Sequence, residues 1–209
     1  METLAAIEGR RSIRRFRPDP LPRATIERLV AAAAQAPSAR NRQPWRFVVL
    51  QGQARLHLAR LMLEGAAAAR ARGDSPGSCE PTARIVAAAP VTILVFNAAY
   101  EHDGLIFDHS RYNAPDIQSI GGMIQTMLLA AHDLGLGSLW IADVLYAYTP
   151  IREWIGRRQE MVAAVSLGCP DEAPAARPRV AWRSRSAPTR RAWTWQMYTP
   201  GGRSKWASC

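Results

Sequence analysis

The feature that most constrains the fold is a long apolar stretch, Ile117 to Leu134, with helical periodicity. Its largest apolar side chains recur every three or four residues, and much of the remainder is apolar or small. A helix that is apolar on more than one side, in a chain of 209 residues, predicts burial between a sheet and a second subunit. The main stripe consists of Ile117, Ile120, Ile124, Met127, Leu128, Ala131 and Leu134.

Helices and strands alternate along the rest of the chain. The length and the hydrophobic fraction of 48% suit one substantial core, so one domain is expected over residues 1–180. Gly73 to Pro81 is polar and is predicted to be a flexible break, and Thr149 with Pro150 predicts the start of a helix. The other predicted helices are 4–9, 25–36, 55–71 and 117–134, and the predicted strands are 47–50, 91–96, 138–142 and 162–167.

The chain offers a cluster of anion-binding groups near its start, at Arg10, Arg11, Ser12 and Arg14. Guanidinium groups present planar forks of N–H donors that suit a phosphate, and a serine hydroxyl adds a compact donor. The alternative is an arginine-rich solvated turn. Phe16, an apolar residue among the charges, and the three prolines that follow it favour a shaped loop.

A second polar segment runs from Pro37 to Trp45, between a predicted helix and a predicted strand. Asn41 and Gln43 carry amides with both donor and acceptor, which suits the edge of an isoalloxazine or another heterocycle. The alternative is stabilisation of a turn, because Ser38 and Asn41 are residue types that commonly bond to nearby backbone in loops.

Together with two later blocks, these segments resemble the nitroreductase superfamily of FMN-dependent oxidoreductases. The later blocks are Leu128 to Ile141, which contains Gly135 and Gly137, and Val165 to Pro170. All four stand in the order and spacing of that family. The resemblance implies an α+β fold, with a mostly antiparallel sheet flanked by helices. It also implies an intertwined homodimer with two FMN sites at the subunit interface.

The resemblance also implies roles for individual residues. The arginine cluster holds the FMN phosphate and ribityl chain, and Arg14 also approaches the N1–O2 edge. The second segment reaches the flavin from the partner subunit, and a glycine-rich backbone segment faces the ring. A basic residue after the fourth block contacts the phosphate. Arg179 is the best match for this residue, and Arg177 is the alternative. The implied cofactor-binding residues are Arg10, Arg11, Ser12, Arg14, Pro37, Ser38, Asn41, Gly137, Ser138, Leu139 and Arg179.

No side chain stands out as a general acid, base or nucleophile. In the family the chemistry belongs to the flavin, which accepts hydride from NAD(P)H at N5 and passes it to a nitroaromatic, a quinone or a similar small molecule. Other members oxidise a peptide or a heterocycle with oxygen as acceptor, or consume the flavin itself. Tyr100, Phe107 and Tyr112 fall where the substrate pocket is expected, although a surface loop with packed rings fits them equally.

The net charge of +10 arises mainly near the C-terminus. Residues 173–209 hold eight of the 27 basic residues and none of the 17 acidic ones, so the rest is nearly neutral. We expect residues 181–209 to form a basic, tryptophan-rich arm that either wraps the partner subunit or is disordered. Nucleic-acid binding through this arm is the less favoured alternative.

The remaining expectations concern compartment and metals. Cys79, Cys169 and Cys209 are widely scattered, which favours the reducing cytoplasm, and the histidines lack zinc spacing, so no metal is expected. The sequence contains no uninterrupted apolar run of about 18 residues and no basic segment that leads into an apolar one. We therefore expect neither a membrane span nor a secretory signal.

Overall fold

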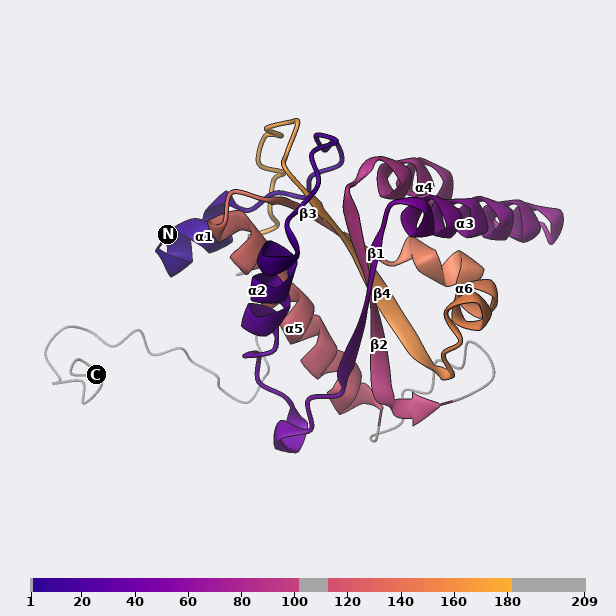
Figure 1. Cartoon of the computed structure of the whole chain (residues 1–209), viewed down its shortest axis with the longest axis horizontal. Helices are drawn as coiled ribbons and strands as arrows, with labels where there is room; N and C mark the ends of the chain where they lie inside the picture. The colour runs from indigo at the N-terminus through magenta and orange to yellow at the C-terminus, as the bar shows by residue number, and fades with distance from the viewer. Residues whose placement is uncertain (1, 102–112, 182–209) are drawn as a thin grey trace, which may run out of the picture. The chain divides into compact units, whose positions relative to one another are not determined.

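The computed structural model describes residues 2–101 and 113–181. It contains a four-stranded sheet in which every neighbouring pair of strands is antiparallel, in the order β1-β2-β4-β3 (Figure 1). This confirms the expected α+β class with an antiparallel sheet. The strands are β1 (Trp45–Gln51), β2 (Val91–Glu101), β3 (Gly137–Ile141) and β4 (Gln159–Gly168).

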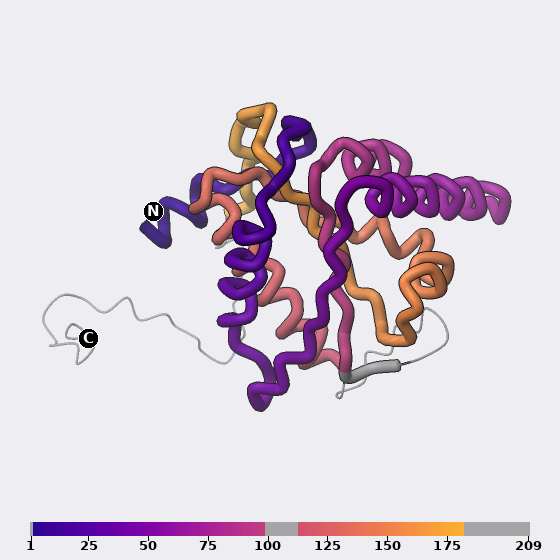
Figure 2. Tube along the Cα trace, viewed as in Figure 1, coloured from indigo at the N-terminus to yellow at the C-terminus, as the bar shows by residue number. Residues whose placement is uncertain are grey.

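Helices cover both faces of this sheet. The helices α2 and α5 pack on one face, whereas α3, α4 and α6 pack on the other (Figures 1 and 2). The helices are α1 (Thr3–Gly9), α2 (Arg23–Ala33), α3 (Gln53–Ala71), α4 (Cys79–Ala88), α5 (Ala114–Asp133) and α6 (Tyr148–Ile155), and the short 3-10 turns are η1 (Ala39–Asn41) and η2 (Asp143–Ala147).

The two central strands are buried on both faces, which explains their nearly continuous apolar sequences. Successive side chains of a strand point to opposite faces. Along β2, Ile93 and Val95 therefore enter the core under α2 and α5, and Leu94 and Phe96 enter the core under α3 and α6. All four side chains have no exposed surface. The central strands thus connect two separate hydrophobic cores.

The helix α5 follows the predicted stripe closely. Ile120, Ile124 and Met127 are fully buried against the sheet and α2, and Leu128 is 3% exposed. The helix begins three residues before the predicted Ile117, with Pro115 in its first turn, where a missing N–H is tolerated. It ends at Asp133, and Gly135 then adopts a left-handed conformation with φ of 72°.

Two local predictions are wrong. The predicted break from Gly73 to Pro81 overlaps α4, because Pro81 lies in the first turn of that helix, where proline is tolerated. Thr149 does not cap a helix, since α6 already begins at Tyr148 directly after η2. Both errors come from a proline in the first turns of a helix. Pro150 led to a predicted start of α6 that is too late, and Pro81 led to a predicted break where α4 begins.

The chain divides into two units, residues 1–174 and 175–209. Of the second unit, the structure describes residues 175–181, so the predicted arm lies almost wholly outside the described residues. Across the described ranges, no helix is long and apolar enough to cross a membrane. Within the same ranges, no group of three or more His, Cys, Asp or Glu residues is placed to hold a metal ion.

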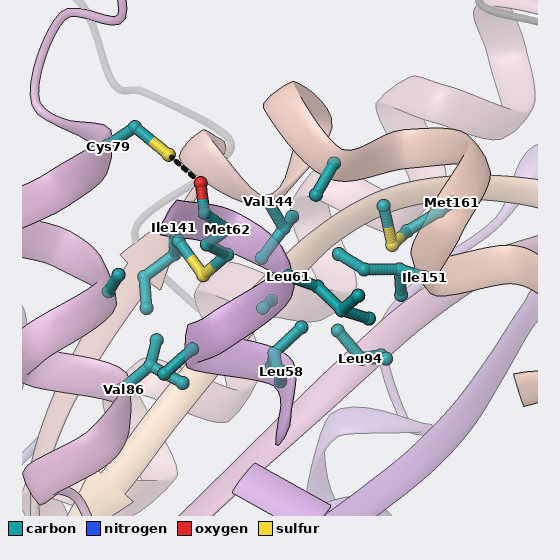
Figure 3. Close-up of a cluster of buried hydrophobic side chains, with 14 of the residues drawn as sticks. Leu58, Leu61, Met62, Cys79, Val86, Leu94, Ile141, Val144, Ile151 and Met161 are labelled. Atoms are coloured by element: carbon teal, nitrogen blue, oxygen red, sulfur yellow. Dashed lines mark hydrogen bonds between the residues drawn. The ribbon is translucent and has the colours of Figure 1, made fainter. Parts of the chain in front are cut away.

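Cys79 anchors α4 to the core beneath it. Its side chain is fully buried, and its Sγ donates to the main-chain oxygen of Met62 on α3 at 3.3 Å (Figure 3). Burial raises the pKa of the Cys79 thiol from its usual value near 9 to about 11, and the carboxylates of Asp143 and Glu80 act in the same direction. The thiol is therefore held in its protonated form.

This pKa predicts a specific loss of stability at alkaline pH. Between about pH 9 and about pH 11 the unfolded chain ionises Cys79 while the folded chain does not, so the free energy of unfolding falls across this window. In a Cys79→Ala variant this contribution is absent. Urea unfolding of both proteins at a series of pH values should show that the free energy of unfolding of the wild type falls relative to that of the variant as the pH rises. A difference that is independent of pH contradicts the assignment.

Candidate functional site

The first polar segment, residues 10–17, is called the arginine segment here, and it lies across the ends of β3 and β4. The backbone N–H of Ile13 donates to the carbonyl oxygen of Ser138 at 3.0 Å, and that of Arg17 donates to the carbonyl oxygen of Cys169 at 2.9 Å. Ser12 and Ser138 form a parallel bridge, and Phe16 and Pro170 form an antiparallel one. Three of the four sequence blocks therefore meet at one end of the sheet.

Two glycines make this close packing possible. A Cβ atom on Gly137 would lie 2.9 Å from Cγ2 of Ile13, and one on Gly168 would lie 2.6 Å from Cδ of Pro90 and 3.1 Å from Cδ1 of Phe16. Ile13 and Phe16 are buried together against Ala89. The apolar residues of the arginine segment thus fix it to the core, while its arginines stay at or near the surface.

Glu172 fixes the same segment by polar contacts. Its Oε1 accepts hydrogen bonds from the backbone N–H of Arg14 and, at 3.1 Å, from that of Arg15. Its Oε2 lies 3.8 Å from Nε of Arg15. The Arg15 guanidinium also donates to the carbonyl oxygen of Asp171 at 3.1 Å. The segment that follows β4 therefore holds the arginine segment through both backbone and side-chain groups.

A cavity of about 460 Å³ opens beside the arginine segment. Arg10 and Arg11 line it together with His132 from the last turn of α5, and Glu172 is the acidic residue of the wall. The Arg11 guanidinium is oriented by the end of α1, since it donates to the carbonyl oxygens of Glu8 at 2.6 Å and Arg10 at 2.9 Å. Two guanidinium groups and one imidazole suit an anionic ligand. The other lining residues are Gly9, Ile13, Gly135, Leu136, Gly137, Ser138, Pro170, Ala173 and Pro174.

Residues 37–43, which form the larger part of the second polar segment, are called the amide loop, and they lie at the opposite end of α5. Oγ of Ser119 accepts from the backbone N–H of Ala39 at 3.1 Å. The Arg42 guanidinium donates to Oδ1 of Asp116 at 2.7 Å, and the Asp116 side chain is only 3% exposed. The first turns of α5 therefore hold this loop in place.

The amide loop has an unusual backbone. Arg40, Asn41 and Gln43 all have positive φ, at 54°, 54° and 48°, and they are the non-glycine residues with positive φ in the described part of the chain. Such conformations cost about 1–3 kcal/mol each and cluster at binding and active sites. Nε2 of Gln43 donates to Oδ1 of Asn41 at 3.1 Å, which orients the Asn41 amide. The loop is thus a shaped, exposed polar surface.

The structure does not bring these two segments together within one chain. The amide loop contacts Asp116 and Ser119 at the start of α5, whereas the cavity is lined by His132 at its end. From Asp116 to His132 the helix axis rises about 24 Å, at about 1.5 Å per residue. Figure 1 shows α1, which precedes the arginine segment, near the end of α5 that is remote from the amide loop.

The other predicted site residues have different outcomes. Ser138 and Leu139 are buried, so the segment can offer a ligand mainly its backbone. Arg179 belongs to the second unit and has no defined position relative to the cavity. Phe107, Tyr112 and the side chain of Tyr100 lie outside the described residues. Glu172, Asp116 and His132 were not predicted, since no local sequence pattern marks a contact with a distant segment.

The fold and the site define an α+β protein in which a positively charged cavity lies beside the edge strand of an antiparallel sheet. Residues 7–169 match the model of the "Nitroreductase family". Because this match covers most of the chain, the protein belongs to the nitroreductase family. Its membership confirms the resemblance of the four sequence blocks.

Individual relatives agree with this assignment. "Putative NAD(P)H nitroreductase YfhC" of Bacillus subtilis is 26% identical, over 86% of this chain and 90% of its own. A 5,6-dimethylbenzimidazole synthase of Rhodospirillum rubrum is 32% identical, over 87% of this chain and 89% of its own. The crystal structure of "a putative nitroreductase in complex with fmn" from Desulfovibrio desulfuricans has a TM-score of 0.68 and 27% identity, over 88% of this chain and 95% of its own.

The contact between Gly137 and Ile13 leads to a stability prediction. Gly137→Ala places a methyl group against Ile13, so we expect it to lower the free energy of unfolding by about 1–3 kcal/mol. In an Ile13→Ala background the same change should have a smaller effect, because two of the three clashing atoms, Cγ1 and Cγ2 of Ile13, are gone. Urea unfolding of the four proteins measures this coupling. An equal effect of Gly137→Ala in both backgrounds contradicts the contact.

Proposed function

We propose that the protein is an FMN-dependent oxidoreductase that transfers hydride from NAD(P)H to a nitroaromatic, a quinone or a similar small molecule. The observation that carries this proposal is the rigidly held arginine segment, which lies beside a cavity lined by Arg10 and Arg11. Membership of the nitroreductase family supports the class of reaction. When bound, FMN supplies the hydride chemistry, and the protein supplies binding and electrostatics.

The residues present fit this cofactor chemically. Arg10 and Arg11 line the cavity and offer donors for a phosphate. Ser12 and the exposed Arg14 belong to the same segment but are not among the residues that line the cavity. Arg14 is proposed to approach the N1–O2 edge of a bound ring, where its positive charge would favour acceptance of hydride by stabilising negative charge. Gly137 and Ser138 line the same cavity, and Leu139 follows them in β3, so the backbone of these three residues is proposed to face the ring.

A second copy of the chain completes the site in this proposal. The amide loop lies about 24 Å along α5 from the cavity of its own chain, so Pro37, Ser38 and Asn41 reach the ring from a partner. Apolar groups exposed on the surface support a homodimer. Leu4 and Ile7 of α1 are 71% and 50% exposed, and Trp140 of the edge strand is 43% exposed and lies close to Gly121 of α5.

Three further parts of the proposal rest on the sequence. Arg179 is proposed to contact the phosphate, the region around Tyr100, Phe107 and Tyr112 is proposed to line the substrate pocket, and the cytoplasm is the proposed compartment. A basic arm that packs on the partner remains favoured over nucleic-acid binding.

One observation favours a second candidate activity. The relative that is 32% identical is named a 5,6-dimethylbenzimidazole synthase and not a nitroreductase. The alternative for this chain is an oxidative reaction on a heterocyclic or peptide substrate, with oxygen as acceptor. Steady-state consumption of NAD(P)H with a nitroaromatic acceptor supports the first candidate. Oxygen uptake without net NAD(P)H oxidation, together with a heterocyclic product detected by mass spectrometry, supports the second.

Binding of FMN tests the cofactor assignment directly. The purified protein should show flavin absorbance, and Arg10→Ala should weaken FMN binding about tenfold or more, since a charge-assisted hydrogen bond is lost. The matched control is Arg23→Ala, which removes an arginine whose side chain is 91% exposed on α2. Titration of the apoprotein with FMN, followed by flavin fluorescence, gives the dissociation constants. A wild-type protein that stays colourless after incubation with FMN contradicts the proposed function.

A further inference from the structure

Glu172 has a role that the arginine cluster alone does not explain. Its carboxylate accepts hydrogen bonds from the N–H groups of two consecutive residues, Arg14 and Arg15, which are 158 and 157 positions away in sequence. Its side chain is 21% exposed, compared with 70% for that of Arg15. An acidic side chain is thus built into the wall of a cavity that otherwise suits an anion.

We infer that Glu172 is a positioning residue that holds the arginine segment in the geometry needed to bind the FMN phosphate. This inference rests on the proposed function. A carboxylate that accepts from backbone N–H groups forms charge-assisted hydrogen bonds, which are about twice as strong as neutral ones. These bonds fix the backbone of Arg14 and Arg15 and do not involve the guanidinium groups of Arg10, Arg11 or Arg14.

The rest of the arginine segment does not fix Arg14 and Arg15 by itself. On one side, Ile13 is bonded to Ser138, and on the other, Arg17 is bonded to Cys169. Between them the chain turns outward, and both Arg14 and Arg15 are exposed. The backbone N–H of Asp171 donates to the carbonyl oxygen of Arg15 at 3.0 Å, and Glu172 supplies the acceptor for the N–H groups of Arg14 and Arg15.

The test compares three variants at neighbouring positions. Glu172→Ala removes the acceptor, and Glu172→Gln keeps an acceptor oxygen but removes the charge. Asp171→Asn removes the same charge from the adjacent residue, which contributes its backbone groups to the contact with Arg15. Each apoprotein is titrated with FMN and with riboflavin, which has the same ring but no phosphate. Thermal unfolding of each apoprotein checks that the variants are folded.

Phosphate positioning predicts a pattern across the two ligands. Glu172→Ala should weaken FMN binding about tenfold or more and leave riboflavin binding within about threefold of wild type. Glu172→Gln should weaken FMN binding less than Glu172→Ala does, because a neutral acceptor oxygen is retained while the charge assistance is lost. Asp171→Asn should stay within about threefold of wild type for both ligands, because Glu172 is unchanged.

Two results overturn the inference while leaving the proposed function intact. One is a Glu172→Ala variant that binds FMN as wild type does. The other is a variant that loses FMN and riboflavin binding equally, since a general loosening of the site affects both ligands. Failure of the wild-type protein to bind FMN is a different result, because it removes the proposed function and the inference together.

Discussion

The burial of α5 across one face of the sheet is the constraint on which the rest of the structure depends. Its apolar stripe fills the core beneath α2, and its two ends fix the positions of two polar surfaces. The start of α5 holds the amide loop through Asp116 and Ser119, and its last turn contributes His132 to the cavity. A straight helix of this length keeps the two surfaces apart within one chain.

The arginine segment shows how a charged cluster is kept in a defined shape. Apolar residues anchor it, since Ile13 lies where a Cβ atom on residue 137 would clash with it, and Phe16 packs beside Gly168. Backbone hydrogen bonds to Ser138 of β3 and to Cys169, directly after β4, fix the course of the segment, and Glu172 accepts from the N–H groups of Arg14 and Arg15. Rigid placement matters for binding, because donors that are already oriented lose less entropy when they engage a ligand.

The sequence predicts much of the fold for physical reasons. The strands β2 and β4 are apolar runs and α5 has a strong helical period, so all three were predicted, although β2 continues five residues beyond the predicted end at Phe96. The helix α4 was missed because Pro81 in its first turn resembles a break. The arginine segment and the amide loop were found from residue types. Glu172 was not, because its contacts join side chain to backbone across 158 positions, and no periodicity or motif reports such a pairing.

The measurement that tests a shared flavin site most directly is subunit complementation. One copy carries Arg10→Ala, the other carries Asn41→Ala, and differently tagged chains are co-expressed so that the mixed dimer can be isolated. At an FMN concentration where neither variant homodimer retains flavin, a shared site predicts one flavin for each mixed dimer, since one of its two sites has both residues intact. A mixed dimer without flavin, beside a wild-type protein that binds it, contradicts a site shared between two chains.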